Sequence, residues 1–296
     1  AHLRAAGWLS EGEHLAAASD LNNNTMQEWG VVITNKHAEP GLFGYPVNVW
    51  VINPAGIYSI APEFMDGETW TIRPMPDVTN DGAAEMLAIE ETCGAHTCYQ
   101  SYYILSYHNN AVEKIAPAQT TADVWTMANS YSEWRVEQHG GSPAFMIHGG
   151  SIGSVGAGIV RTYTEVFVYS AEDNQMHLVD TILDETNWRH HLLYEANDKT
   201  DSGQAFSIET GIALYERVIE DESLEDYGHA FEVDPRHDMN QYAAFRLIYT
   251  WLRAADVTNA DNWLTYLQTN YADTPLTLAA TAMRDGTVRP DLTITL

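Results

Sequence analysis

The strongest constraint on what this chain can fold into is an internal repeat, because one arrangement of short apolar segments recurs three times before residue 184. Each block contains three runs rich in β-branched and aromatic residues. The period is about 57 residues, measured from Asp20 to Asp77. The runs are residues 29–33, 47–52 and 57–60 in the first block, 86–89, 102–107 and 112–115 in the second, and 144–147, 165–169 and 176–179 in the third.

The repeated runs predict antiparallel strands joined by hairpins, so we expect each block to be a small meander of about four strands. Such a meander cannot bury both of its faces alone, and the blocks must therefore stack on one another. We place the blocks at about residues 8–64, 65–120 and 121–184, which together form a mainly β N-terminal domain, 1–184.

The loops that open the first and second blocks have the spacing of a calcium-binding loop. Residues 20–28 and 77–85 both place oxygen-bearing side chains at positions one, three, five and nine. Calcium takes about six to eight oxygen ligands, and the carbonyl of position seven would add a backbone ligand. An Asx-rich turn without a metal is the alternative, since Asp and Asn are favoured in turns. The expected ligands are Asp77, Thr79, Asp81, Ala83 and Glu85 in one loop, and Asp20, Asn22, Asn24, Met26 and Glu28 in the other.

These loops, with the strand that follows each, resemble the FG-GAP/VCBS repeats, which are bacterial relatives of the integrin α-chain propeller, over roughly residues 8–180. The resemblance implies calcium bound by loops of the pattern Asp-x-Asp/Asn-x-Asp-Gly-x-x-Asp/Glu, and a propeller-blade-like form for each meander. Three blocks are fewer than the about four to eight blades of a propeller. We therefore expect the C-terminal domain, a neighbouring copy or further blocks to cover the open edges.

The chain departs from that family pattern in several places. Thr25 stands where the family has Gly, so a left-handed backbone there would cost about 1 kcal/mol. Thr79 replaces the usual carboxylate or amide but keeps a hydroxyl oxygen. The loop at 77–85 carries three carboxylates against two in 20–28, so we expect it to bind calcium more tightly. The matching residues of the third block, 135–143, lack the ligand pattern, and we expect no ion there.

After Asp184 the apolar residues change to helical spacing, which predicts an all-α domain over residues 185–289. Paired helices, with a final helix after Pro275, resemble tetratricopeptide-type hairpins; a generic helical bundle is the alternative. We expect an acidic surface loop at 220–237 and a short turn at 256–259. The predicted apolar faces are Ile208, Ile212, Tyr215 and Ile219; Ala244, Leu247, Ile248, Trp251, Leu252 and Ala255; Trp263, Leu264, Leu267 and Tyr271; and Leu278, Ala279, Ala282 and Met283.

The end of the chain, residues 290–296, alternates apolar and polar side chains and predicts a C-terminal strand. A lone strand is unstable, so it must add to a sheet edge. Docking within the same molecule and docking on the next molecule are both open. The second would propagate head to tail into a fibre.

The two cysteines, Cys93 and Cys98, are separated by four residues in a segment that we expect to be a loop between strands. We predict a disulfide that fixes a hairpin and contributes on the order of 2 kcal/mol. A metal pair with His96 nearby and two unrelated buried thiols are the alternatives. A disulfide would indicate an oxidising compartment such as the cell surface or the medium.

Charge and hydropathy exclude several classes of partner. Lys and Arg total 14 against 41 Asp and Glu, and the net charge of −27 would repel the phosphates of a nucleic acid. The sequence contains no run near the about eighteen consecutive apolar residues of a membrane span, so we expect no transmembrane segment.

A catalytic constellation is not evident in the sequence. His190 and His191 are expected in a helix, where neighbouring side chains point about 100° apart and cannot share one ion. The glycine-rich residues 148–158 lack the Lys and the following helix of a phosphate-binding loop. Most of the nine tryptophans fit a core pattern, and one or two remain candidates for stacking on a carbohydrate.

Together, these features predict a non-catalytic extracellular or cell-surface protein that serves as a structural or adhesion scaffold stabilised by calcium. Self-assembly into a polymer or fibre is a further expectation. The expected partners are a second copy of the chain or another surface protein, with a carbohydrate as a further candidate. The alternative function is an accessory or catalytic part of a secreted enzyme that degrades a polysaccharide or a peptide. A buried carboxylate pair in a cleft would support that alternative.

Overall fold

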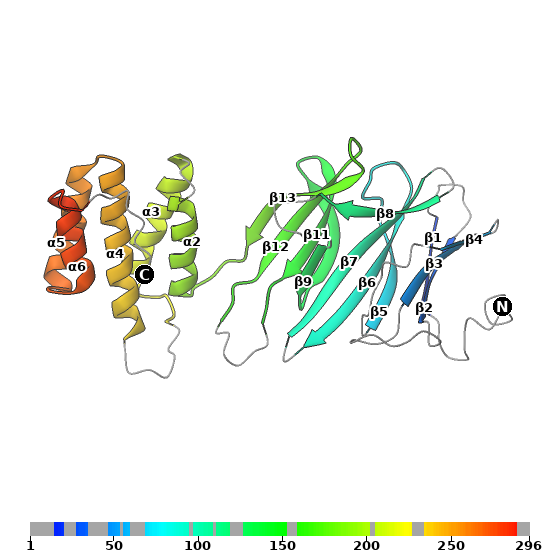
Figure 1. Cartoon of the computed structure of the whole chain (residues 1–296), viewed down its shortest axis with the longest axis horizontal. Coiled ribbons are helices and arrows are strands. Elements are labelled where there is room, and N and C mark those ends of the chain that lie inside the picture. Colours follow the sequence, from blue (N-terminus) through cyan, green and yellow to red (C-terminus); the bar gives the residue numbers. More distant parts are fainter. Residues whose placement is uncertain are drawn as a thin grey trace. The chain divides into compact units, whose positions relative to one another are not determined.

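The computed structural model describes residues 15–20, 28–34, 47–53, 56–59, 69–94, 97–108, 111–118, 127–152, 159–201, 205–226 and 234–288. The chain divides into two compact units, Ala1–Asp184 and Glu185–Leu296. All described strands belong to the first unit and all described helices to the second (Figure 1). The predicted order, a β-rich region followed by helices, is therefore confirmed. Within the described residues, no helix combines the length and apolarity needed to cross a membrane.

The strands of the first unit, called the β unit below, form two sheets. Strands β1 to β4 form an antiparallel sheet, and the remaining described strands form a second, nine-stranded sheet. The bounds are β1 Leu15–Ser19, β2 Glu28–Thr34, β3 Val47–Asn53, β4 Gly56–Ser59, β5 Thr69–Met75, β6 Glu85–Gly94, β7 Thr97–His108, β8 Ala111–Pro117, β9 Met127–Ser130, β10 Glu133–His139, β11 Ser142–Gly149, β12 Tyr163–Ser170 and β13 Gln175–Leu183.

The smaller sheet packs on the larger one at Gly30 of β2. A Cβ atom on this residue would lie 2.4 Å from Cδ1 of Ile72 in β5 and 2.6 Å from the sulfur of Met86 in β6. Any side chain here would force Ile72 and Met86 to shift, so glycine lets the backbone of β2 lie close to both. The first block therefore stacks on the second.

The nine-stranded sheet joins the second and third blocks. Its order is β10-β11-β12-β13-β8-β7-β6-β5, with β9 paired to β7. The two blocks meet where β13 and β8 run parallel, at the pairs Gln175 with Ala116 and Met176 with Pro117. Because this sheet is continuous, the second and third meanders are not separate blades.

Strand β9 brings the larger sheet close to a barrel. Ser130 of β9 pairs with Tyr99 of β7, and its carbonyl accepts a hydrogen bond of 3.0 Å from the backbone N–H of Gly150, directly after β11. Strands β7 and β11 are thus linked on one side through β9 and on the other through β8, β13 and β12. The result is a nearly closed, barrel-like sheet.

An apolar core fills the inside of this sheet. Side chains alternate between the two faces of a strand, so every second residue of a strand can point inward. Burial of these side chains supplies the main driving force for folding of the β unit. The cluster consists of Met75, Val78, Leu87, Tyr102, Ile104, Ile115, Met127, Phe145, Ile147, Phe167 and Met176.

The predicted disulfide between Cys93 and Cys98 is present. The two residues lie directly opposite each other in the antiparallel pairing of β6 with β7. The expected loop around them is wrong, because strand pairing continues to Gly94 and Thr97 and places both cysteines within the hairpin.

The described helices of the second unit, called the helical unit below, share one apolar core. Each helix contributes buried residues to it, among them Leu192, Tyr215, Leu247, Leu267 and Met283. The bounds are α2 Arg189–Asp201, α3 Ala205–Glu220, α4 Pro235–Arg253, α5 Val257–Asn270 and α6 Pro275–Arg284.

Two connections predicted for the helical unit are wrong in their bounds, because capping residues begin helices within them. The expected turn at 256–259 is the start of α5, because the Asp256 carboxylate accepts a hydrogen bond of 3.0 Å from the backbone N–H of Asn259. The expected loop at 220–237 ends earlier, because Asp234 caps α4 and the following proline opens that helix. The predicted C-terminal strand, 290–296, lies outside the described residues.

Two residues of the predicted apolar faces do not point into the core. Leu278, on α6, is 60% exposed. Ala255 lies beyond the end of α4 and is exposed, with a φ of 59°. The helical period placed both side chains inward, but α6 is short and packs with one narrow face, and α4 ends before Ala255.

Candidate metal centre

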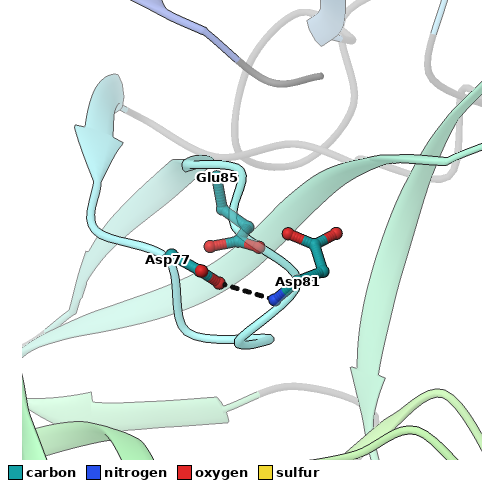
Figure 2. A group of neighbouring side chains, drawn as sticks. All are labelled: Asp77, Asp81 and Glu85. Atoms are coloured by element: carbon teal, nitrogen blue, oxygen red, sulfur yellow. Dashed lines mark hydrogen bonds between the residues drawn. The ribbon is translucent and has the colours of Figure 1, made fainter. Parts of the chain in front are cut away.

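The loop between β5 and β6 gathers three acidic side chains. Carboxylate oxygens of Asp77, Asp81 and Glu85 lie within 4.8 Å of one another. Figure 2 shows the three side chains grouped around the turn of the loop, with Glu85 at the start of β6. This spacing, with carboxylates at positions one, five and nine, brings together residues that the sequence predicted as ligands. Oxygen atoms this close to one another could hold a cation.

Backbone hydrogen bonds fold the loop around Asp77. Its Oδ1 accepts from the N–H of Asp81 at 3.2 Å, and its Oδ2 accepts from the N–H of Gly82 at 2.8 Å. Asn80 and Gly82 have φ values of 59° and 91°, in the left-handed region that glycine and asparagine adopt most readily. The Asx-Gly chemistry of the sequence therefore fixes the path of this loop.

Glu85 is the buried member of the group, with no exposed surface. One of its oxygens accepts from the N–H of Val78 and the other from the hydroxyl of Thr79, both at 2.8 Å. The pKa of Glu85 is raised to about 7, because burial and, to a smaller extent, the negative charges of Asp77 and Asp81 outweigh the two hydrogen bonds, which lower it. Burial dominates because two donors compensate only part of the lost hydration.

Thr79 and Ala83 complete the predicted ligand set of this loop. The Thr79 hydroxyl lies 2.8 Å from Glu85 and 3.4 Å from an oxygen of Asp77, so it faces the acidic group. The N–H of Ala83 donates to Oδ1 of Asp81 at 2.8 Å, which ties position seven to position five. Both residues are therefore held beside the three carboxylates.

Of the first predicted loop, only its two ends lie in the described part of the chain. Asp20 is half-buried and Glu28 is fully buried at the start of β2. Within the described residues, these two carboxylates belong to no cluster of three possible ligands. The other expected ligands of this loop, Asn22, Asn24 and Met26, lie outside the described residues.

All three blocks border the acidic loop. From the first block, the carbonyl of Asp20 accepts a hydrogen bond of 3.3 Å from the N–H of Ala84. From the third block, Tyr169 lies near enough that Asp81 and Glu85, among other acidic groups, add to burial in raising the pKa of its hydroxyl. These neighbours were not predictable from the sequence, since they come from segments far apart in the chain.

In the third block, the residues that match the ion loops form a hairpin. Residues 135–143 span the end of β10, a turn and the start of β11. The turn consists of Gly140 and Gly141, whose φ values of 60° and 89° suit glycine. The carboxylate pattern of the other two blocks is absent from this hairpin.

A second polar cluster, which the sequence did not predict, lies at the end of β13. Asp184 accepts hydrogen bonds from the hydroxyl of Thr162 and, at 2.8 Å, from Nε2 of His148 when that nitrogen carries the proton, while Arg161 donates to its carbonyl at 2.6 Å. The hydrogen bonds from His148 and Thr162 lower the pKa of Asp184. His148 and Asp184 are separated by 36 residues, so only the strand pairing brings them together.

Comparisons with known protein families, curated proteins and solved structures give no match for this chain. The interpretation of the metal centre therefore depends on its own geometry.

Proposed function

We propose that residues 77–85 bind calcium. The observation that carries this proposal is the convergence of Asp77, Asp81 and Glu85 within 4.8 Å, one of them buried. A carboxylate that burial disfavours, with two further carboxylates beside it, is strongly stabilised by a cation. The available ligands are oxygens alone, and hard oxygen donors favour calcium or magnesium over zinc or copper. The three carboxylates of this short loop favour calcium, which accepts irregular oxygen geometry, whereas magnesium requires a near-ideal octahedron.

We propose that Thr79 and the carbonyl of Ala83 add the ligands at positions three and seven. The second site at 20–28 is proposed on the matching spacing of Asp20 and Glu28. The resemblance to FG-GAP/VCBS repeats implies this arrangement of ligands. We also propose a blade-like origin for the three meanders. For the paired helices, we propose a tetratricopeptide-like origin. The antiparallel pairing of β1 to β4 supports the first of these proposals.

For the protein as a whole, we propose a non-catalytic scaffold of the cell surface or the medium, with a structural or adhesive role. The disulfide supports an oxidising compartment. The acidic loop supports a structural use of calcium, because residues of all three blocks border it and a bound ion would hold in place the loop that they contact. Its partners are proposed to be further copies of the chain or another surface protein.

Microscopy and activity assays on one preparation test this role. The purified protein is imaged by negative-stain electron microscopy with calcium and with a chelator, and each sample is assayed against soluble polysaccharides and peptides. We expect ordered assemblies that depend on calcium and no hydrolysis in either sample. Calcium-dependent hydrolysis would instead identify a secreted enzyme.

A further inference from the structure

We propose that the β unit carries a second binding site, for a neutral oligosaccharide, in a cleft of about 450 Å³ between the edge strands β5 and β10 of the larger sheet. This inference goes beyond the proposed calcium site, with which the cleft shares no residue. The cleft is lined by residues of β5, β6, β7 and the connection from β9 into β10. They are Thr71, Arg73, Ile89, Glu91, Gln100, Tyr102, Ser132, Glu133 and Trp134.

The cleft is bordered by strands on both sides. Strands β5 and β10 stand at the two ends of the strand order, and both contribute lining residues. Ligand sites are usually clefts that are largely formed before the ligand binds, and strands on both sides provide such a preformed wall here. A volume of this size suits a ligand of a few sugar rings at most.

The apolar side of the cleft is an aromatic surface supported from behind. Trp134 and Ile89 are partly buried and pack against the core cluster of the β unit. The rings of Trp134 and Phe145 have centroids 6.1 Å apart, so the indole is fixed in place by a fully buried neighbour. A rigid indole beside a polar wall suits a ligand with one apolar face and several hydroxyl groups, as a sugar ring has.

The polar side of the cleft is a hydrogen-bonded network centred on Gln100. Its Nε2 donates to Glu91 at 2.7 Å, and its Oε1 accepts from the N–H and the hydroxyl of Ser132 at 2.7 and 3.0 Å. The hydroxyls of Tyr102 and Ser132 lie 2.8 Å apart. This network orients the wall before a ligand binds, which lowers the entropy lost on binding.

Charged groups at the cleft favour a neutral ligand. The side chains of Arg73 and Glu133 form no hydrogen bond or ion pair with the described residues, and Glu91 has one carboxylate oxygen outside the network. Two carboxylates, in a chain of net charge −27, disfavour phosphates and other anions. The guanidinium of Arg73 offsets one of these two negative charges. Neutral hydroxyl groups satisfy both kinds of charge, since each hydroxyl donates and accepts.

Glycan binding tests this site in buffer that contains calcium. The intact protein is screened on an array of immobilised neutral oligosaccharides, and hits are measured by isothermal titration calorimetry, with free amino acids and dipeptides as the competing ligand class. We expect a neutral oligosaccharide to bind. Arg73→Gln and Glu133→Gln should each weaken it about tenfold or more, because each removes a charge-assisted hydrogen bond.

Two further variants separate binding from folding. Trp134→Leu removes the aromatic surface, and its circular dichroism shows whether the fold is kept. Arg135→Gln is the matched control, an exposed arginine on β10 that does not line the cleft. Absence of any glycan binding, binding of amino acids or dipeptides instead, or affinities that Arg73→Gln and Glu133→Gln leave unchanged would overturn the proposal.

Discussion

The two units of the molecule each bury a charged side chain, and they compensate it in opposite ways. In the helical unit, the fully buried Arg189 donates to the carboxylate of Asp226 at 2.7 Å and to the carbonyls of Val218 and Asp221. In the β unit, Glu85 is equally buried but has two neutral donors and, within the described residues, no cationic partner. The helical unit supplies its own counter-charge, whereas the described residues of the β unit supply none for Glu85.

The largest loss of stability is expected for a change at Arg189, because the helical unit itself compensates this buried charge. Arg189→Met should lower the free energy of unfolding of the helical unit by about 3–5 kcal/mol, because Asp226 and two backbone carbonyls lose their buried partner. Hydrogen exchange resolved by mass spectrometry should show faster exchange in α2 to α6 and unchanged exchange in the β unit.

The matched control for that variant is Arg217→Gln in α3. Arg217 is exposed and pairs with Asp221 one helical turn away, so its loss should cost no more than about 0.5 kcal/mol. If both arginines had the same small effect, the helical unit would not depend on its buried ion pair.

Removal of calcium should have the next largest effect, and only in the β unit. At a calcium concentration about 100 times the dissociation constant, binding adds about 2.7 kcal/mol to the free energy of unfolding. A chelator should therefore speed hydrogen exchange in β5 to β8 and leave the helices unchanged. Asp77→Ala should reproduce this effect more strongly than Asp20→Ala, because the 77–85 loop has the additional carboxylate. Identical hydrogen exchange in β5 to β8 with and without chelator would mean that the β unit does not depend on calcium.

Reduction of the disulfide should destabilise the β unit by on the order of 2 kcal/mol, since its closed ring is short. The Cys93→Ala/Cys98→Ala double variant should show faster exchange in the hairpin of β6 and β7. As a control, both proteins are measured with and without reductant. Reductant should speed exchange in the unaltered protein and leave the variant unchanged. A loss of protection across the helices as well would mean that the units are coupled.

The pH dependence of the β unit provides the smallest effect. Because the pKa of Glu85 is raised to about 7, the folded state binds a proton that the unfolded state has released above about pH 4.5. In chelator, the free energy of unfolding should therefore fall as pH rises. The stabilisation from the proton on Glu85 is lost as pH passes through about 7. Between pH 5 and 7, Glu85→Gln should reduce that fall by roughly 1–2 kcal/mol in urea titrations. Parallel pH profiles for the two proteins would contradict the raised pKa.

Each run of the repeat coincides with a described strand, but the sequence predicted neither β1, β5, β9 and β10 by position nor how the strands pair into sheets. Residues 29–33, 86–89 and 144–147 fall in β2, β6 and β11, because β-branched runs bounded by turn residues have few other options. The β9 strand and the parallel contact of β8 with β13 could not be predicted, since both depend on pairing between distant segments. Local patterns therefore identify the meanders, while tertiary pairing closes the barrel.

The candidate site was predictable for a similar reason and to a similar extent. Asp77, Asp81 and Glu85 lie in one short loop, so their spacing alone brought them together. The burial of Glu85 was not visible in the sequence, because it results from neighbouring strands that cover the loop. The cleft at Trp134 was not predictable, since its residues come from four segments and the sequence pointed only to one or two unspecified tryptophans as carbohydrate contacts.

Direct titration of calcium tests the central claim most sharply. Chelator-stripped protein is titrated by isothermal calorimetry alongside Asp77→Ala and the control Asp173→Asn, an exposed acid in the turn between β12 and β13. We predict saturable binding whose tightest site disappears in Asp77→Ala and persists in Asp173→Asn. Calcium binding that Asp77→Ala leaves unchanged, or no binding by the unaltered protein, would contradict a calcium-stabilised β unit.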